Sequence, residues 1–241
     1  QGRRPPQLAE TGPGEIRRVT HTFNQMSSDL ARLDEDRALI LAGISHDLRT
    51  PLTRLRLAAE MSADAATREG ISADIDEMDK IIGQFLDFAR DTEGESPEPT
   101  NINSVVLHIT EPLQRRGARI ELHLAELPPL MLRPLALLRL ASNLINNALR
   151  HGGGTAPVEV QTRREEGRII LEVMDRGPGI PPEEAERLKQ PFTRLETART
   201  GAASAGLGLA IVDRVARGHG GRFDLLSREG GGLIARVTLP A

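Results

Sequence analysis

Residues 168–180 read Arg-Ile-Ile-Leu-Glu-Val-Met-Asp-Arg-Gly-Pro-Gly-Ile, an apolar run that ends at Asp175 and passes into a turn. The β-branched and leucine side chains favour a buried strand, and the glycines and proline favour a tight turn. A carboxylate at a strand end can accept a hydrogen bond from a ligand amine, and glycines let the backbone approach a flat ligand closely. A plain turn is the alternative interpretation of Asp175, Gly177, Gly179 and Ile180.

Further strands and helices surround this run. Residues alternate between apolar and polar around 120–124 and 158–160, as in strands, and two more candidate strands cover 221–226 and 232–239. Helical segments interleave with them at about 103–116, 134–150 and 207–217. These patterns predict an α/β domain, with a mixed sheet and its own core.

The front of the chain is helical in pattern instead. One apolar seam, with alternating steps of three and four, predicts a coiled-coil helix; it comprises Ile16, Val19, Phe23, Met26, Leu30 and Leu33. A second seam runs from Leu41 to Leu55, one position out of register with the first. Either the register slips at a stutter or two separate helices meet there.

A third seam runs from Ile71 to Ala89, and a polar stretch over 62–70 separates it from the second. This arrangement indicates two helices folded into a hairpin. Their apolar stripes would stay half covered in one chain, so we expect a dimer that forms a four-helix bundle. Acids, prolines and a glycine over 91–100 mark a linker to the α/β domain.

Composition excludes several classes of protein. The 241 residues carry 31 Lys and Arg against 34 Asp and Glu, so the net charge of −3 excludes a strongly basic nucleic-acid binder. There is no cysteine, which excludes disulfides, thiolate metal sites and a cysteine nucleophile. No apolar stretch is long enough to span a membrane.

His46 falls on the second seam at the position farthest from the apolar stripe, so it should be exposed. Asp47 and Thr50 are within reach of the same reacting group, and Pro51 kinks the helix just after them. An imidazole oriented by a carboxylate can act as a nucleophile. A solvated histidine beside a solvated aspartate is the alternative.

Two other patterns suit a nucleotide. Asn143 and Asn147 lie one turn apart near the end of the 134–150 helix, and amide oxygens suit Mg²⁺ held together with phosphates, although asparagine is also common at helix ends. Gly206 and Gly208 open a helix whose free N–H groups suit a phosphate. Residues 182–205, before these glycines, are interpreted as a mobile loop over the site.

The order of these motifs resembles that of EnvZ-like sensor histidine kinases. The stretch Gly43–Arg54 resembles the family's H box, followed by Asn-x-x-x-Asn, Asp-x-Gly-x-Gly, Pro191-Phe192 and Gly-Leu-Gly-Leu over about residues 15–240. The resemblance implies a helical dimerisation hairpin followed by a GHKL (Bergerat-type) α/β sandwich that binds ATP, as in Hsp90, gyrase B and MutL. It also implies that Glu15–Leu33 is similar to the second helix of a HAMP linker.

The resemblance implies roles for individual residues. His46 is the phosphorylated nucleophile, Asp47 its base, and Thr50 the residue that positions water in the phosphatase reaction. Asn147, helped by Asn143, holds Mg²⁺, and Asp175 binds the adenine amine. The other residues expected around the nucleotide are Arg150, His151, Gly177, Gly179, Ile180, Gly206, Leu207 and Gly208, with Phe192, Arg194 and Thr200 in the region of a lid.

Three residues depart from the family pattern. His151 stands where EnvZ-like sequences have tyrosine, Lys189 where the first phenylalanine of the lid motif is usual, and Ser204 where a glycine is usual. None of them is a residue with an expected chemical role. Each change could lower the affinity for ATP.

The expected domains are a partial HAMP linker over 1–37, a dimerisation and phosphotransfer hairpin over 38–91, a linker over 92–101 and an ATP-binding domain over 102–241. The expected function is autophosphorylation of His46 from ATP–Mg²⁺, transfer to an aspartate of an OmpR-type response regulator, and dephosphorylation of that regulator. The chain would be the cytoplasmic portion of a bacterial inner-membrane protein and a homodimer. The sequence gives neither the stimulus nor the choice between phosphorylation within and between subunits.

Two rival functions differ in what they predict. A conformational ATPase of the Hsp90 or MutL kind would keep its full ATPase activity in a His46→Gln variant. A non-catalytic signalling scaffold would form dimers and bind the regulator, but ATP would never label it. The H box argues against the first, and the set of Asn147, Asp175, Gly206 and Gly208 argues against the second.

Overall fold

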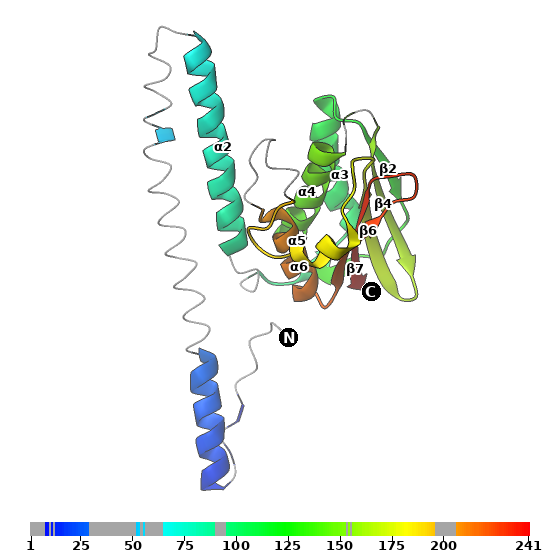
Figure 1. The fold of residues 1–241 in the computed structure, drawn as a ribbon. Coiled ribbons are helices and arrows are strands. Elements are labelled where there is room, and N and C mark those ends of the chain that lie inside the picture. Colours follow the sequence, from blue (N-terminus) through cyan, green and yellow to red (C-terminus); the bar gives the residue numbers. More distant parts are fainter. Residues whose placement is uncertain are drawn as a thin grey trace. The chain divides into compact units, whose positions relative to one another are not determined.

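The computed structural model describes residues 8, 9, 11, 13–28, 52, 53, 55, 65–89, 95–152, 154, 156–195 and 206–241. The chain divides into two units, Gln1–Glu93 and Gly94–Ala241. Figure 1 shows both units. Among the described residues, no helix combines the length and apolar character that crossing a membrane requires.

Most described residues of the first unit lie in helices. Residues 14–28 form a helix, as the first seam predicts, and α2 spans Ala65–Ala89. The polar stretch over 62–70 was predicted to connect two helices, and the predicted end of this connection was wrong. Residues 65–70 already belong to α2, and Gly70 lies inside that helix. Along the third seam Ile75 is buried, whereas Met78 is 49% exposed. Within one chain this stripe is therefore only partly covered.

The second unit is built on a five-stranded sheet in the order β2-β4-β5-β7-β6. Strands β2 and β4 are parallel, and the other neighbours are antiparallel. The strands span Ile120–Leu124 (β2), Val158–Glu165 (β4), Arg168–Met174 (β5), Arg222–Ser227 (β6) and Leu233–Pro240 (β7). All five were predicted from the sequence, and the mixed α/β sandwich is confirmed.

Three helices pack against one face of the sheet (Figure 1): α3 (Ile102–Arg115), α4 (Pro134–His151) and α6 (Gly208–Gly218). Helix α4 contacts both other helices and strands β4 and β5. Its side chains Leu140, Leu144 and Ile145 are almost completely buried. Each contributes about 1.5–3 kcal/mol through burial, so α4 is fixed firmly on the sheet.

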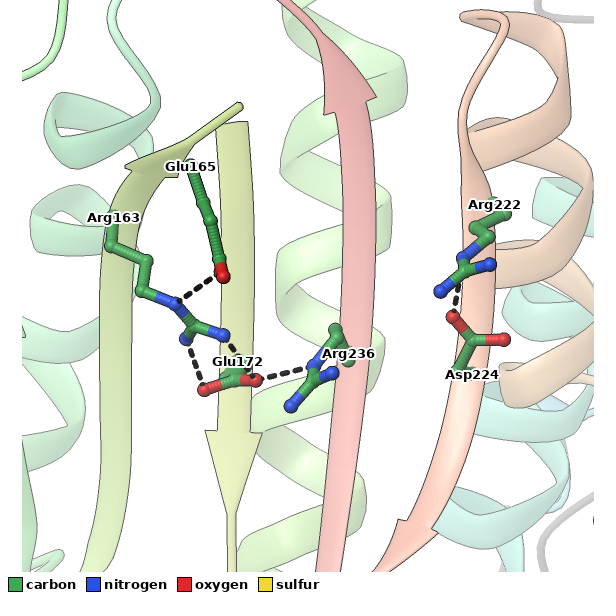
Figure 2. A network of polar contacts seen from close by, with 6 residues as sticks. All are labelled: Arg163, Glu165, Glu172, Arg222, Asp224 and Arg236. Carbon is green, nitrogen blue, oxygen red and sulfur yellow. Dashed lines mark hydrogen bonds and ion pairs between the residues drawn. The ribbon is translucent and has the colours of Figure 1, made fainter. Parts of the chain in front are cut away.

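The other face of the sheet carries charged side chains (Figure 2). Arg163 donates two hydrogen bonds to the buried carboxylate of Glu172, and Arg236 donates a third from strand β7. Burial by itself would raise the pKa of Glu172, but the hydrogen bonds from Arg163 and Arg236 lower it below its usual value. Beside this cluster, Arg222 pairs with Asp224 on β6 at 2.8 Å. The carboxylate of Glu172 is thus satisfied across three adjacent strands, β4, β5 and β7.

Short elements escaped the sequence analysis. Strand β1 (Glu98–Thr100) pairs with β3 (Leu130–Leu132), and a 3-10 turn η2 (Pro182–Glu184) leads into α5 (Ala185–Leu188). The start of the stretch 182–205, expected as a loop, is thus helical and buries Leu188. Three-residue strands and single helical turns are too short to show a period.

Part of the segment expected as a linker is attached to the second unit. The Glu95 carboxylate accepts hydrogen bonds from the backbone N–H groups of Leu135 (2.6 Å) and Ala136 (3.1 Å). These are otherwise unpaired donors of the first turn of α4, where the helix dipole also favours an anion. The Arg133 guanidinium donates to the Glu95 carbonyl at 3.1 Å. Residues from Glu95 onward therefore contribute contacts to the fold of the second unit.

His219 links the same helix start to the end of α6. Its Nε2 accepts the Arg133 backbone N–H at 3.1 Å, and its Nδ1 lies 2.8 Å from the Val215 carbonyl. Both contacts are satisfied by a neutral imidazole with its proton on Nδ1. Burial lowers the pKa of His219, and nearby Arg133 lowers it further, against the opposing effects of the Val215 hydrogen bond and of Glu95.

This arrangement predicts a pH-dependent stability. The unfolded chain keeps a histidine pKa near 6.5, so the contribution of His219 is complete above that pH and is lost as the pH falls through the folded-state pKa. In His219→Asn we expect a loss of about 1 kcal/mol at pH 7.5 and a shallower decline below pH 6.5. Urea unfolding between pH 5 and 8 measures both, with exposed His108→Asn as the control. Equal slopes in wild type and His219→Asn would contradict the assignment.

Candidate functional site

The end of α4 and the start of α6 lie next to each other. The amide nitrogen of Asn143 donates to the Arg139 carbonyl at 2.8 Å, which directs its amide oxygen away from its own helix. That oxygen would lie 3.0 Å from a Cβ atom at Gly208, the first residue of α6. The structure therefore brings together two motifs 65 residues apart in the sequence. Asn147 lies one turn farther along α4, half-buried.

Asp175 follows strand β5 and is 4% exposed. Its Oδ1 accepts hydrogen bonds from the N–H groups of Gly177 (2.8 Å) and Leu233 (3.3 Å). Its own N–H donates to the Leu233 carbonyl at 3.0 Å. Contacts from two strands and from the turn after β5 thus fix the orientation of the carboxylate. A buried group that accepts a hydrogen bond from a ligand needs such a fixed orientation.

Glycines allow the backbone to crowd around Asp175. A Cβ atom at Gly177 would lie 2.1 Å from the His151 carbonyl oxygen, and one at Gly232 would lie 2.1 Å from the Asp175 carbonyl oxygen. Gly179 has a φ of +73° and packs against Gly232. The end of α4, the turn after β5 and the turn before β7 therefore meet at one place, where side chains would not fit.

Phe192 and Gly206 join the two sides of the segment 196–205. The Phe192 N–H donates to the Gly206 carbonyl at 3.0 Å, and the positive φ values of both residues form a tight junction. The phenyl ring of Phe192 is 64% exposed. The two described stretches that border 196–205 are thus held together next to the start of α6.

Lys189, one of the departures from the family pattern, has a defined environment. Its ammonium group binds Glu186 at 2.6 Å and lies 5.8 Å from the centre of the Phe223 ring. Only 8% of its side chain is exposed. The aliphatic stem therefore fills buried space while the charge is satisfied by the carboxylate and the ring.

His151 ends α4 beside the Asp175 turn. Partial burial lowers the pKa of its imidazole, the Arg150 charge lowers it further, Asp175 opposes this effect, and Arg194 adds to it. The pKa therefore lies below the usual value of 6.5, and the ring at neutral pH is uncharged. A neutral imidazole can pack against an aromatic base without repelling nearby cations.

Some predicted residues lie outside the description. His46, Asp47, Thr50 and Thr200 fall on residues that the structure does not describe, as does Ser204. Leu207, expected at the nucleotide, is completely buried, so its side chain belongs to the core and only its backbone faces the glycine turn. Ile180 and Arg194 are half-buried near the turn and the 191–195 stretch.

Sequence analysis missed the contribution of the β6–β7 turn. Leu233 and Gly232 hold Asp175 directly, and Arg228 donates to its backbone carbonyl at 3.2 Å. The triple glycine 230–232 was the available signal, because three adjacent glycines at a strand boundary indicate close backbone approach.

The described residues contain no group of three or more His, Cys, Asp or Glu side chains that could hold a metal ion by themselves. The amide oxygens of Asn143 and Asn147 are hard donors that suit Mg²⁺ when ligand phosphates supply the remaining oxygens. The donor set therefore fits a cation that binds together with a nucleotide.

Two family models match the chain. The model described as "Histidine kinase-, DNA gyrase B-, and HSP90-like ATPase" matches residues 133–241. The model described as "His Kinase A (phospho-acceptor) domain" matches residues 36–94. Together they cover residues 36–94 of the chain, which include His46, and most of the second unit.

The chain is also similar to individual proteins. It is 36% identical over 234 residues to the sensor histidine kinase GtrS of Pseudomonas aeruginosa, covering 97% of this chain and 48% of GtrS. It is 33% identical over 237 residues to the sensor protein RstB of Escherichia coli, covering 92% of this chain and 53% of RstB. The chain spans about half the length of the curated relatives it matches.

A solved structure, full-length ShkA in complex with AMPPNP, matches with a TM-score of 0.67 and 25% identity. The match covers 83% of this chain and 45% of ShkA.

The crowding at Asp175 gives a test with a matched control. Gly231 and Gly232 both have positive φ, but a Cβ atom at Gly231 meets nothing within 4 Å, whereas one at Gly232 overlaps the Asp175 carbonyl. We expect Gly231→Ala to lower the free energy of unfolding by about 1 kcal/mol through strain alone, and Gly232→Ala to lower it by about 2 kcal/mol more. Urea unfolding of both variants measures the difference. Equal losses would show that the turn can move away from Asp175 freely.

Proposed function

The chain belongs to the sensor histidine kinases, and on this premise we propose that it transfers the γ-phosphoryl group of ATP to His46 and then to an aspartate of a response regulator. The observation that carries the proposal is the meeting of Asp175, the end of α4 and the glycine-rich start of α6 in one unit. This unit matches an ATPase model, and the preceding one matches a phospho-acceptor model that includes position 46.

We infer that adenine lies at Asp175. The two donors that hold the carboxylate both reach Oδ1, so we assign Oδ2 to the exocyclic amine of the base. The close approach of the backbone at Gly177 and Gly179 suits a flat ring. A neutral His151 beside this turn would pack against the base.

The phosphates would then lie between α4 and α6. The N–H groups at the start of α6 and its dipole favour negative charge, and Gly206 and Gly208 let this backbone pass close to Thr193 and Asn143. Asn147, assisted by Asn143, would hold Mg²⁺ against the phosphates. The cation, when bound, neutralises the charge that develops on the transferred group.

The phosphoryl transfer needs one nucleophile and one base. The lone pair of His46 Nε2 attacks the γ-phosphorus as the bond to the β–γ bridging oxygen breaks, and ADP leaves with that electron pair. Asp47 accepts the Nδ1 proton, which becomes more acidic as the N–P bond forms. An aspartate carboxylate of the regulator then attacks the phosphorus and breaks the N–P bond. In the phosphatase reaction, Thr50 would position a water molecule that hydrolyses the acyl phosphate of the regulator.

The wider setting follows from the same proposal. The partly covered stripe of α2 and the exposed seam at Ile16, Val19 and Met26 are the surfaces that a second copy would bury, so we propose a homodimer. Residues 1–37 would be part of a HAMP linker. Because ATP is an intracellular substrate, we propose that the chain works in the cytoplasm as part of a longer membrane receptor, with an OmpR-type regulator as its partner.

Labelling with γ-³²P-ATP and Mg²⁺ tests the proposal. The wild-type chain should acquire label that is labile in acid and stable in alkali, as expected of phosphohistidine. His46→Gln should lose at least about 99% of it, because no other nucleophile occupies that position. Exposed His108→Gln is the matched control and should label as wild type.

Two results would contradict the proposal. Equal labelling of the wild type and His46→Gln would place the phosphoryl group elsewhere. Steady ATP hydrolysis by both proteins without stable label would instead favour a conformational ATPase.

A further inference from the structure

Arg228 occupies the turn between β6 and β7, and only 9% of its side chain is exposed. Its Nη1 donates to the backbone carbonyl of Asp175 at 3.2 Å, and its Nη2 forms a short ion pair with Glu159 on strand β4. The turn itself is closed by hydrogen bonds between Arg228 and the backbone of Gly231 and Gly232. One guanidinium group therefore ties the end of β5 to β4 and to the β6–β7 turn.

Placing an arginine at a nearly buried position is energetically unfavourable by itself. Removing its charge from water is unfavourable unless well-placed partners offset the lost hydration. The guanidinium is planar, always charged, and presents donors in a fixed fork. Its two partners, the Asp175 carbonyl and the Glu159 carboxylate, match that fork, so the backbone of Asp175 has little freedom to rotate.

The hydrogen bonds of Asp175 show how Arg228 restrains this residue. Its N–H and its Oδ1 both bind Leu233, and Oδ1 also binds Gly177. Arg228 supplies the contact to the remaining backbone polar group, the carbonyl. Without it, the peptide after Asp175 would lose one of its restraints, and the direction of Oδ2 would be held less tightly by the remaining contacts to Gly177 and Leu233.

We propose that Arg228, paired with Glu159, is a positioning residue that sets the selectivity of the site for a purine carrying an exocyclic 6-amino group. The inference rests on the proposed function, because it assumes that Asp175 receives the adenine amine. Arg228 touches neither the nucleotide nor the reacting atoms. It acts through the orientation of Asp175.

The test compares two ligands that differ only in that amine. Isothermal titration calorimetry with ATP and with purine riboside triphosphate, which lacks the 6-amino group, gives a ratio of dissociation constants for each protein. In Arg228→Ala, the affinity for ATP should fall, the affinity for the analogue should stay nearly constant, and the ratio should shrink about tenfold. Arg228→Lys should recover part of the ratio, because one ammonium group cannot serve both partners.

Arg222→Ala is the matched control. It removes an arginine from the neighbouring strand and breaks the Arg222–Asp224 pair of Figure 2, but the Arg222 side chain is 68% exposed and its ion pair lies within β6, at the opposite end of that strand from the turn that carries Arg228. Its ratio should equal that of the wild type. If Arg228→Ala fails to fold, Glu159→Gln provides the test instead. This variant keeps the guanidinium group but weakens its ion pair, so the ratio of dissociation constants should shrink by a smaller factor.

The possible outcomes separate the two proposals. A wild-type chain that prefers ATP, with variants that weaken both ligands equally or leave the ratio unchanged, overturns the role of Arg228 and leaves the proposed function standing. A wild-type chain that binds neither ligand overturns the proposed function and this inference together. A ratio that shrinks in Arg228→Ala and Glu159→Gln but not in Arg222→Ala supports the inference.

Discussion

The backbone around the end of strand β5 is packed so closely that neighbouring positions have no room for side chains. Gly177 touches the last turn of α4, and Gly232 touches the carbonyl of Asp175. This crowding forces the strand, the helix end and the β6–β7 turn into one arrangement, and it directs a buried carboxylate into the space beside α4. The positions of Asn143 and the start of α6 follow, because α4 is fixed by its buried leucine and isoleucine side chains.

The remainder of the α/β unit supports that arrangement from a distance. Glu95 and His219 fix the first turn of α4, at the end opposite the site. On the other face of the sheet, Arg163, Glu172 and Arg236 connect three strands through charged hydrogen bonds (Figure 2). Helix, sheet and turn are therefore each held by contacts that do not involve a ligand. Such a site is organised before a nucleotide binds, which reduces the entropy lost on binding.

Much of this was predictable from sequence, and the failures have physical reasons. The period of two at Ile120–Leu124 and the apolar run before Asp175 identified strands correctly, because buried faces impose a strong pattern. The capping of α4 by Glu95 was not predictable, because the residue lies in an acidic, proline-containing stretch that resembles any linker. Arg228 was missed for a similar reason: one arginine in a turn gives no pattern, and its role depends on Glu159, 69 residues away. Leu207 sits inside a glycine motif, but its side chain is part of the core.

We propose that the nucleotide lies where the end of β5, the end of α4 and the start of α6 meet. NMR of the ¹⁵N-labelled chain, titrated with ATP–Mg²⁺, tests this placement. The largest shifts are expected at the backbone amides of Gly177, Leu233 and Gly208, and at the side-chain amide of Asn147. Shifts confined to the opposite face of the sheet, around Arg163 and Arg236, would contradict it.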